Sequence, residues 1–391
     1  FTFSSLVLYW AHLSARWCFG FWYYNLGFDI YYDEKPSYWF SLKKAKSMQQ
    51  KIAIVGAGSV GCYLGGCLAA NDVDVILIGR ERIQKQLTDY GLHVTDWKGR
   101  DETLTMEQLQ FSVSMDSIAS ADYILLAVKS GDTESTAVSI LACAKPSAVI
   151  VSFQNGTKNV DVLKTVLPDH KVIKGMVPFN VLNNGKGQFH CGTEGNLAIE
   201  AKDGEYPDLV NAFKQASLPL TLHEDIQGVQ WGKLIMNLNN SVNALSGVPL
   251  LEQMNNRNYR LVMTKVIAEA LAVMKVAGIK PARTGKVVPS LMPYVLALPN
   301  FLFKRVASAT LKIDPKARSS MYEDFVLNRK TEIDFLNGEI VNLAKQYGMT
   351  APVNESIVSL VKEAEQKQSG SPMHSAEFLQ NVIKNAIKKH H

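Results

Sequence analysis

The sequence predicts an α/β domain over residues 48–224, followed by an all-helical domain over residues 225–391. Two observations support this division. Up to about residue 200, short apolar runs typical of buried strands alternate with helical periodicities and glycine-containing turns. From about Asp225 onward the strand patterns stop and long helical periodicities take over, which places the boundary near residues 222–228.

A glycine turn near the start of the α/β domain indicates a phosphate-binding site. The apolar run 51–55 is followed by G-A-G-S-V-G, then by a helix predicted over about 59–70 and a second strand over 73–78. In this motif the first glycine allows the tight turn, the second admits a pyrophosphate and the third lets the helix pack closely. The free N–H groups of the helix would face the phosphates. We therefore expect a dinucleotide to bind at Gly56, Ala57, Gly58, Ser59, Val60 and Gly61. A glycine turn of some other α/β unit is the alternative.

The end of the second strand indicates which dinucleotide is bound. NAD-specific sites usually place an acidic residue there, on the ribose 2′-hydroxyl. Here the strand is followed by Gly79 and Arg80. A guanidinium suits a 2′-phosphate because it forms bidentate, charge-assisted hydrogen bonds. We predict NADP(H) as the cofactor, with Arg80 as a cofactor-binding residue; an ordinary surface arginine is the alternative, and the adjacent Glu81 weakens the preference.

Composition excludes several classes of function. The hydrophobic content of 47% and charged content of 20% are typical of a soluble globular protein. The net charge of +5 is mild for this length and forms no basic stripe, so no nucleic-acid partner is expected. The cysteines are few, scattered and odd in number, and they form no metal-ligand pattern: Cys18, Cys62, Cys67, Cys143 and Cys191. We expect no metal and a reducing, cytoplasmic setting.

The first 47 residues differ from the rest of the chain. They hold 16 of its 36 aromatic residues and four of its six tryptophans, and Met48 directly precedes the first strand. We predict that residues 1–47 are a non-native or disordered extension and leave them out of the fold. A membrane anchor over residues 6–28 is the alternative, but His12, Arg16 and Asn25 interrupt it, so no membrane contact is expected.

The remaining elements follow from apolar runs and helical periodicity. Further strands are predicted over 111–113, 123–128, 149–153, 172–177 and 197–200, with helices over 82–90 and 135–142 and a polar β region over 92–109. The run 123–128 should lie centrally and end at Lys129, on the carboxyl edge where ligands bind. The helical domain should contain helices over 230–246, 259–277, 317–347, 354–368 and 375–388, with two or three short ones over 287–306.

The helix predicted over 230–246 carries polar residues on an otherwise apolar sequence. Lys233, Asn237 and Ser241 are spaced four apart and therefore share one face. Burial would lower the pKa of such a lysine and make its ammonium a credible proton donor to a developing alkoxide. A solvent-facing polar stripe explains the same spacing equally well.

A second polar stretch lies on the helix predicted over 317–347. It contains Ser320 and Glu332, which are roughly 120° out of alignment on an ideal helix. They could flank one ligand only if it lay between them or if the helix bent. From the residues alone, a solvated helix rich in i,i+4 pairs is the preferred interpretation.

From Met48 almost to the C-terminus the chain resembles the ketopantoate reductases (2-dehydropantoate 2-reductases). The resemblance is carried by the glycine turn, Ala127-Val128-Lys129, Gln154-Asn155-Gly156, Trp231-x-Lys233-Leu234 with Asn237, Ser319-Ser320-Met321, and Thr331-Glu332-Ile333-Asp334 with Asn337-Gly338. It implies a Rossmann domain followed by a helical domain like that of 6-phosphogluconate dehydrogenase. It also implies reduction of ketopantoate to pantoate with NADPH, on the route to pantothenate and coenzyme A, and it allows a homodimer.

The resemblance also implies roles for individual residues. Lys233 matches the general acid, and Glu332 matches an acidic residue that orients the substrate and lies at the cofactor. Substrate-binding positions are matched by Asn155, Asn237, Ser241 and Ser320, and cofactor-binding positions by Arg80, Lys129 and Asn155. Ser241 stands where the family often has a second asparagine, which leaves the identity of the 2-oxo acid open. A reductase of another branched 2-oxo acid, an opine-type dehydrogenase and a non-catalytic NADP-sensing protein are the alternatives.

Overall fold

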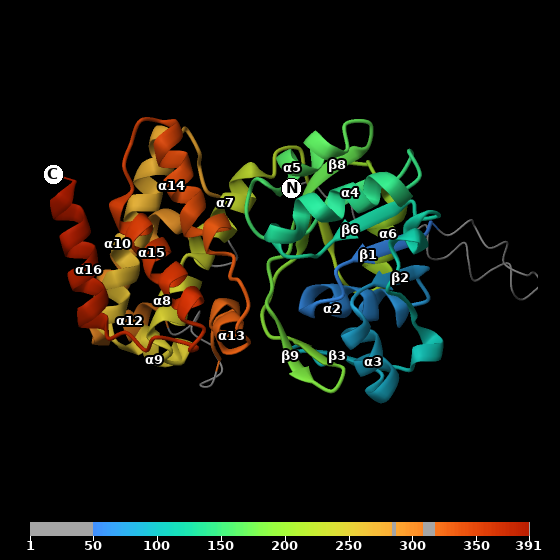
Figure 1. Cartoon of the computed structure of the whole chain (residues 1–391), viewed down its shortest axis with the longest axis horizontal. Helices are drawn as coiled ribbons and strands as arrows, with labels where there is room; N and C mark the ends of the chain where they lie inside the picture. Colours follow the sequence, from blue (N-terminus) through green and yellow to red (C-terminus); the bar gives the residue numbers. More distant parts are fainter. Residues whose placement is uncertain (1–49, 284–286, 308–316, 391) are drawn as a thin grey trace, which may run out of the picture. The chain divides into compact units, whose positions relative to one another are not determined.

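The structure is a computed structural model that describes residues 50–283, 287–307 and 317–390 (Figure 1). The predicted extension over residues 1–47 and Met48 lie outside the described residues. Within the described ranges, no helix combines the length and the apolar character that crossing a membrane requires.

The α/β part is built on an eight-stranded sheet, counted over the described residues, in the order β12-β11-β8-β7-β6-β1-β2-β5. All neighbouring strands are parallel except the antiparallel pair β8 and β11. The central strands are Val, Ile and Leu runs buried on both faces, as a parallel sheet covered by helices requires. The strands are β1 (Ile52–Val55), β2 (Val75–Ile78), β5 (Gln110–Ser112), β6 (Tyr123–Leu126), β7 (Val149–Ser152), β8 (Lys171–Met176), β11 (Leu197–Glu200) and β12 (Leu220–His223).

Helices cover both faces of this sheet. Buried residues of α2 (Ser59–Ala69), α3 (Glu81–Tyr90) and α6 (Pro207–Gln215) share one core with the sheet. Those of α4 (Thr133–Cys143) and α5 (Asn159–Val166) form a second core with the opposite face. The α/β fold class predicted from the alternation of strands and helices is confirmed.

A second, four-stranded sheet packs beside α2. Its order is β4-β3-β10-β9, with β3 (Leu92–Asp96) and β4 (Asp101–Leu104) lying inside the predicted polar β region, joined by β9 (Val181–Gly185) and β10 (Gln188–Cys191). Gly66 of α2 faces this sheet so closely that a methyl group would overlap Leu92 and Val94. The strands β9, β10 and β12 were not predicted from the sequence. The sequence L-N-N-G within β9 lacks apolar alternation, and β3 and β10 pair across nearly a hundred residues of chain.

The C-terminal part is helical and has its own core (Figure 1). In it α10 (Arg257–Val276) contacts α14 (Asn337–Gln346), α15 (Pro352–Lys367) and α16 (Ala376–Lys389). The other helices are α7 (Gln227–Asn237), α8 (Asn239–Ser246), α9 (Leu250–Asn255), α11 (Met292–Ala297), α12 (Asn300–Ala307) and α13 (Ser320–Val326), with short 3-10 turns η4 (Pro289–Leu291) and η5 (Ile333–Phe335). The predicted helical domain is confirmed, although the predicted helix 230–246 is divided at Leu238 into α7 and α8.

The single long helix predicted over 317–347 was wrong. Its residues form α13, the turn η5 and α14. The chain leaves α13 at Asn328, whose φ of 48° is left-handed. The N–H groups of Asn328 and Arg329 donate to the carbonyls of Phe325 and Asp324, which is the hydrogen-bond pattern of a Schellman helix end. Helical periodicity did not reveal this stop because asparagine, not glycine, occupies the left-handed position.

Asn328 is therefore expected to set the stability of this helix end. Asn328→Val should lower the free energy of unfolding by about 1–2 kcal/mol, because a β-branched side chain is strained at positive φ. Asn328→Gly should match or exceed the parent protein. Urea unfolding of the three proteins measures both effects, and equal stability of the valine variant would contradict this account.

Candidate active site

The ends of β6 and β7 bring the predicted site residues together. Leu126 and Ser152 are paired in register, so the segments that follow them leave the sheet at the same edge. The segment after β7 is fixed by Gln154, which is buried and donates from Nε2 to Thr133 Oγ1 at 2.7 Å and to the Val128 carbonyl at 3.3 Å. Asn155 follows directly and extends into the site.

Lys233, Asn155 and Glu332 form a continuous hydrogen-bonded chain. The Nζ of Lys233, on α7, donates to Oδ1 of Asn155 at 2.8 Å. The Nδ2 of Asn155 donates in turn to Oε2 of Glu332 at 2.9 Å. These three residues lie far apart in the sequence, so the fold brings together the lysine, amide and carboxylate that the resemblance singled out.

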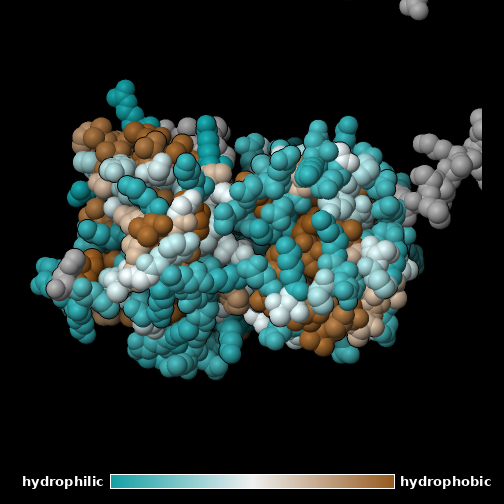
Figure 2. All heavy atoms as spheres, turned by 90° about the horizontal axis from the view of Figure 1, so that it is seen from above, coloured by the Kyte–Doolittle hydropathy of each residue, from teal (hydrophilic) through white to brown (hydrophobic). Residues whose placement is uncertain are grey.

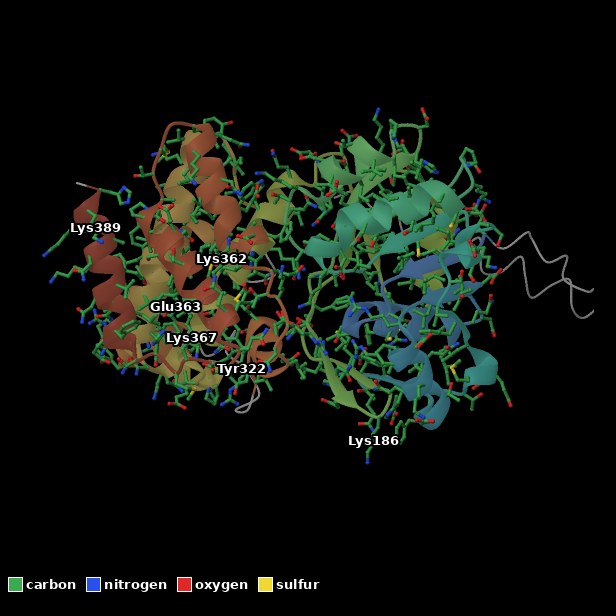
Figure 3. The ribbon with its side chains drawn as sticks, in the orientation of Figure 1. Lys186, Tyr322, Lys362, Glu363, Lys367 and Lys389 are labelled. Carbon is green, nitrogen blue, oxygen red and sulfur yellow. The ribbon has the colours of Figure 1, made fainter. Side chains whose placement is uncertain are left out.

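Glu332 is oriented by donors from two strand ends. Its Oε1 lies 3.1 Å from the backbone N of Ser130 and 3.0 Å from the hydroxyl of Ser130, while Asn155 donates to its other oxygen. The backbone around Glu332 is supported by α15: Glu365 accepts from the Thr331 N–H at 2.7 Å. Lys362, labelled in Figure 3, pairs with Asp334 at 2.7 Å. Ser130 and Asn155 thus hold the carboxylate of Glu332, while α15 holds the neighbouring residues Thr331 and Asp334.

The electrostatics of Lys233 favour proton transfer. Burial removes water from the ammonium and lowers the pKa of Lys233 to about 8, with the negative charge of Glu332 opposing the shift. Part of the residue's surface stays accessible, yet the amine lies deep enough among protein atoms for desolvation to dominate. A lysine with this pKa is protonated at neutral pH and can give up its proton, which is what a general acid needs.

A narrow pocket opens at this lysine. It is lined by Gln154, Asn155, Gly156, Gly175, Met176, Gln230, Lys233, Leu234 and Asn237. A wider hollow among polar residues around the α9–α10 junction and Asn300 is open to solvent and contains no residue of the Lys233 chain. The narrow pocket therefore defines the candidate active site.

Of three predicted substrate-binding residues on the helical part, one lines the pocket and two do not. Asn237 lines the pocket one helical turn after Lys233. Ser241 lies on α8, fully buried, with its hydroxyl donating to the Leu238 carbonyl at 2.9 Å, and it is not part of the pocket lining. Ser320 is an exposed residue at the start of α13. The substrate-binding roles of Ser241 and Ser320 remain predictions without a contact to support them.

Lys129 makes contacts that were not predicted. Its Nζ donates to Asp324 Oδ1 at 2.5 Å and to the Lys330 carbonyl at 3.1 Å. Burial raises the pKa of the Asp324 carboxyl, and Lys129 opposes that rise. Ser130 could have been found from its place at the carboxyl end of β6. Asp324 had no such signal, because its partner lies 195 residues away in the chain.

The glycine turn has the shape that a pyrophosphate requires. Gly56 has φ of 108°, and a side chain on Gly61 would overlap the Gly56 carbonyl oxygen. A Cβ built on Gly58 would meet nothing within 4 Å, so the backbone there is open to a ligand. Among the described residues, no side chain caps the first turn of α2. Its free N–H groups fit the phosphates of a dinucleotide.

Arg80 lies where the second strand ends, as predicted. Its guanidinium is exposed and 3.6 Å from the exposed carboxylate of Asp132. An exposed pair at this distance is weak, so Arg80 can turn toward another anion. Neither residue is buried enough to be locked in its present contact.

A dinucleotide-type glycine turn after β1 and a lysine of lowered pKa bonded to Asn155 after β7 are together the features of a dinucleotide-dependent oxidoreductase of two parts. Residues 52–204 match the family model of ketopantoate reductase PanE/ApbA, and residues 225–365 match the model of its C-terminal part. The chain belongs to the ketopantoate reductase PanE/ApbA family, which confirms the resemblance.

This chain matches several named relatives over nearly their whole length. The 2-dehydropantoate 2-reductase of Archaeoglobus fulgidus is 25% identical over 321 residues, which is 81% of this chain and 98% of the relative. That of Pyrococcus horikoshii is 28% identical over 336 residues, 82% of this chain and 99% of the relative. A PanE/ApbA family ketopantoate reductase from Ralstonia eutropha is 30% identical, with a TM-score of 0.69 over 82% of this chain and 99% of its own.

A structural neighbour outside the ketopantoate reductases shares the fold. D-mandelate dehydrogenase, in a ternary structure with NADH and anilino(oxo)acetate, is 21% identical with a TM-score of 0.67, over 82% of this chain and 99% of its own. At this identity the likeness concerns the fold alone. The fold of this chain is therefore also found in a protein named D-mandelate dehydrogenase.

Proposed function

We propose that this protein reduces 2-dehydropantoate (ketopantoate) to pantoate with NADPH, in the cytoplasm, as a step toward pantothenate and coenzyme A. The observation that carries the proposal is the hydrogen-bonded chain of Lys233, Asn155 and Glu332 at the carboxyl edge of a dinucleotide-type sheet. Family membership and relatives named 2-dehydropantoate 2-reductase support the same substrate.

In the proposed mechanism the glycine turn 56–61 would hold the cofactor, and its nicotinamide would supply a hydride to the substrate's carbonyl carbon. Lys233 hydrogen-bonds the carbonyl oxygen and transfers a proton from Nζ to it as negative charge develops, which leaves a neutral amine that solvent reprotonates. Asn155 holds the ammonium from one side, at 2.8 Å. Glu332, fixed by Ser130 and Asn155, accepts a hydrogen bond from the far hydroxyl of the substrate and favours the charged form of Lys233.

The direct test of this function is NADPH oxidation by purified protein with a small panel of 2-oxo acids, with and without an amine. We expect ketopantoate to be the preferred substrate and no amine to be required. A reductase of another branched 2-oxo acid is the second candidate, favoured by one observation: the hydroxyl of Ser241 donates to Leu238 rather than lining the pocket. Binding of NADPH without turnover of any 2-oxo acid would contradict both candidates.

The preference for NADPH over NADH rests on Arg80. Arg80→Ser should weaken NADPH binding about 10- to 100-fold, because one charge-assisted contact to the 2′-phosphate is worth roughly 1.5–3 kcal/mol. NADH binding should stay unchanged. Cofactor fluorescence titration measures both dissociation constants.

Asp132→Asn is the matched control for Arg80. It removes the carboxylate 3.6 Å from the guanidinium and should leave NADPH binding intact or slightly tighter. An equal loss of affinity for both cofactors in the Arg80 variant, or no loss for either, would contradict the assignment.

A homodimer is part of the proposal. Exposed apolar side chains on α11 and α12, including Tyr294 and Phe301, provide apolar surface that a second copy could cover. On the face shown in Figure 2, separate hydrophobic patches lie among hydrophilic side chains. A ketopantoate reductase of Staphylococcus aureus, which shares the fold at 17% identity, is described as dimeric. Light scattering of the purified protein gives the oligomeric state directly.

A further inference from the structure

Glu339 is a buried carboxylate that the proposed mechanism does not use. It is the third residue of α14 and only 4% exposed. Its Oε1 accepts from the hydroxyl of Thr157 at 3.1 Å, and its Oε2 lies 3.3 Å from Nζ of Lys158. Burial raises the pKa of Glu339, and the neighbouring Lys158 opposes the rise.

The two partners of Glu339 directly follow the catalytic segment. Asn155 and Gly156 precede Thr157 in the chain, and Gly156 has φ of 86°. A Cβ on Gly156 would lie 3.3 Å from the carbonyl oxygen of Phe335, so this turn packs on the backbone of η5. The segment 155–158 is therefore held against η5 and α14.

Two carboxylates from one stretch of chain hold this segment at both ends. Glu332 accepts from the Asn155 amide, and Glu339 accepts from Thr157 two residues later. On the sheet side, the Asn155 carbonyl accepts from Asn159 Nδ2. Within the described structure, Asn155 is the one residue of this set whose side chain also forms a hydrogen bond with Lys233.

We propose that Glu339 is a positioning residue, which fixes the 155–158 segment so that Asn155 presents its Oδ1 to the Lys233 ammonium. The inference rests on the proposed role of Lys233 as proton donor. Among the hydrogen bonds and ion pairs of the described residues, loss of the Thr157–Glu339 bond leaves one between the segment and α14. That contact is the Lys158–Glu339 ion pair, in which the Lys158 side chain is 38% exposed. A partly exposed lysine can turn into water, and small displacements of catalytic groups are costly.

Three variants separate the hydrogen bond from the charge. Thr157→Val removes the donor, and Glu339→Leu removes the acceptor; each should lower kcat for ketopantoate about 10- to 100-fold with the cofactor KM unchanged. Glu339→Gln keeps an oxygen that accepts from Thr157 and should restore kcat to within about threefold of the parent. The double variant Thr157→Val/Glu339→Leu should lose no more than Glu339→Leu alone, because the Thr157–Glu339 hydrogen bond is already absent in that single variant.

The control is Glu363→Gln on α15. Glu363 forms an exposed i,i+4 pair with Lys367 at 2.6 Å, and both residues are labelled in Figure 3. Loss of one exposed ion pair should change neither kcat nor KM. If Glu339→Leu fails to fold, Thr157→Val carries the test, since it changes a half-buried loop residue by little volume.

A second measurement does not depend on turnover. Trace labelling of Lys233 with acetic anhydride, quantified by mass spectrometry over a pH series, gives its pKa in the free protein. We expect about 8 for the parent. The pKa should be lower in Thr157→Val if Asn155 no longer accepts from Nζ, because a hydrogen bond to the ammonium favours its charged form.

The outcomes distinguish this proposal from the proposed function. A lowered Lys233 pKa in Thr157→Val supports the positioning role even if ketopantoate is not a substrate. Unchanged Lys233 pKa with unchanged kcat overturns it. A third outcome also overturns it: kcat falls in step with thermal stability, the Lys233 pKa does not change, and Glu339→Gln does not restore kcat. That result would assign Glu339 a merely structural role.

Discussion

Replacing Lys233 by methionine is expected to lower kcat for ketopantoate reduction by about 10²- to 10⁴-fold, the usual contribution of a positioned general acid. The dissociation constant of NADPH should change little, because the proposed phosphate site at the glycine turn 56–61 does not include Lys233. Steady-state kinetics and fluorescence titration on the same preparation measure both. Asn155 would lose the donor 2.8 Å from its Oδ1, while its bond to Glu332 would remain.

The same variant should be more stable than the parent protein at neutral pH. The pKa of Lys233 falls from 10.5 to about 8 on folding, so the unfolded chain binds more protons between these values. Burial of the ammonium therefore costs stability below about pH 8, and this cost disappears as pH rises through 10.5. Lys233→Met removes the cost, which should raise the free energy of unfolding by about 1–3 kcal/mol at neutral pH.

Denaturant unfolding at neutral and at strongly alkaline pH checks this sign. The advantage of Lys233→Met should be present at neutral pH and lost in alkali. A variant that is less stable than the parent at neutral pH would show that Lys233 is not desolvated. Lys233→Met should thus lose activity and gain stability, as is expected when a functional side chain lowers the stability of the folded protein.

Gly61→Ala should have the second large effect, on cofactor binding and on folding together. Its methyl group would overlap the Gly56 carbonyl oxygen, so α2 must move away from the strand that precedes the turn. We expect NADPH binding to weaken more than about 100-fold and the free energy of unfolding to fall by roughly 1–3 kcal/mol, the usual cost of overpacking.

Gly58→Ala is the matched control for packing. Its Cβ would meet nothing within 4 Å, so the protein should fold with unchanged stability. Binding of NADPH should still weaken, because the methyl group occupies the space that the pyrophosphate approaches. If Gly61→Ala binds NADPH like the parent, or Gly58→Ala is destabilised, the account of this turn is wrong.

The features that the sequence predicted best depend on neighbouring residues. The predicted helix 59–70 is α2, Ser59–Ala69, because a glycine turn between two apolar runs leaves little other choice. Lys233 and Asn237 share the pocket because both lie on α7. The pocket lining does not include Ser241, which is fully buried on α8 with its hydroxyl bonded to the Leu238 carbonyl.

Features that depend on distant residues were not predicted. The Lys129–Asp324 and Thr157–Glu339 contacts join positions 195 and 182 residues apart, and no local pattern marks either partner. The angle of roughly 120° between Ser320 and Glu332 applies only if both residues lie on one continuous helix. The left-handed Asn328 breaks that helix, so Glu332 reaches the strand ends from the separate turn at η5 instead.

The most direct test of the central claim is the pH dependence of kcat/KM for ketopantoate at saturating NADPH, compared between the parent protein and Lys233→Met. The parent should lose activity as pH rises through about 8, because the proton donor is titrated away. The variant should show a low rate without this decline. A variant that retains the parent's rate and the same alkaline decline would show that another group donates the proton.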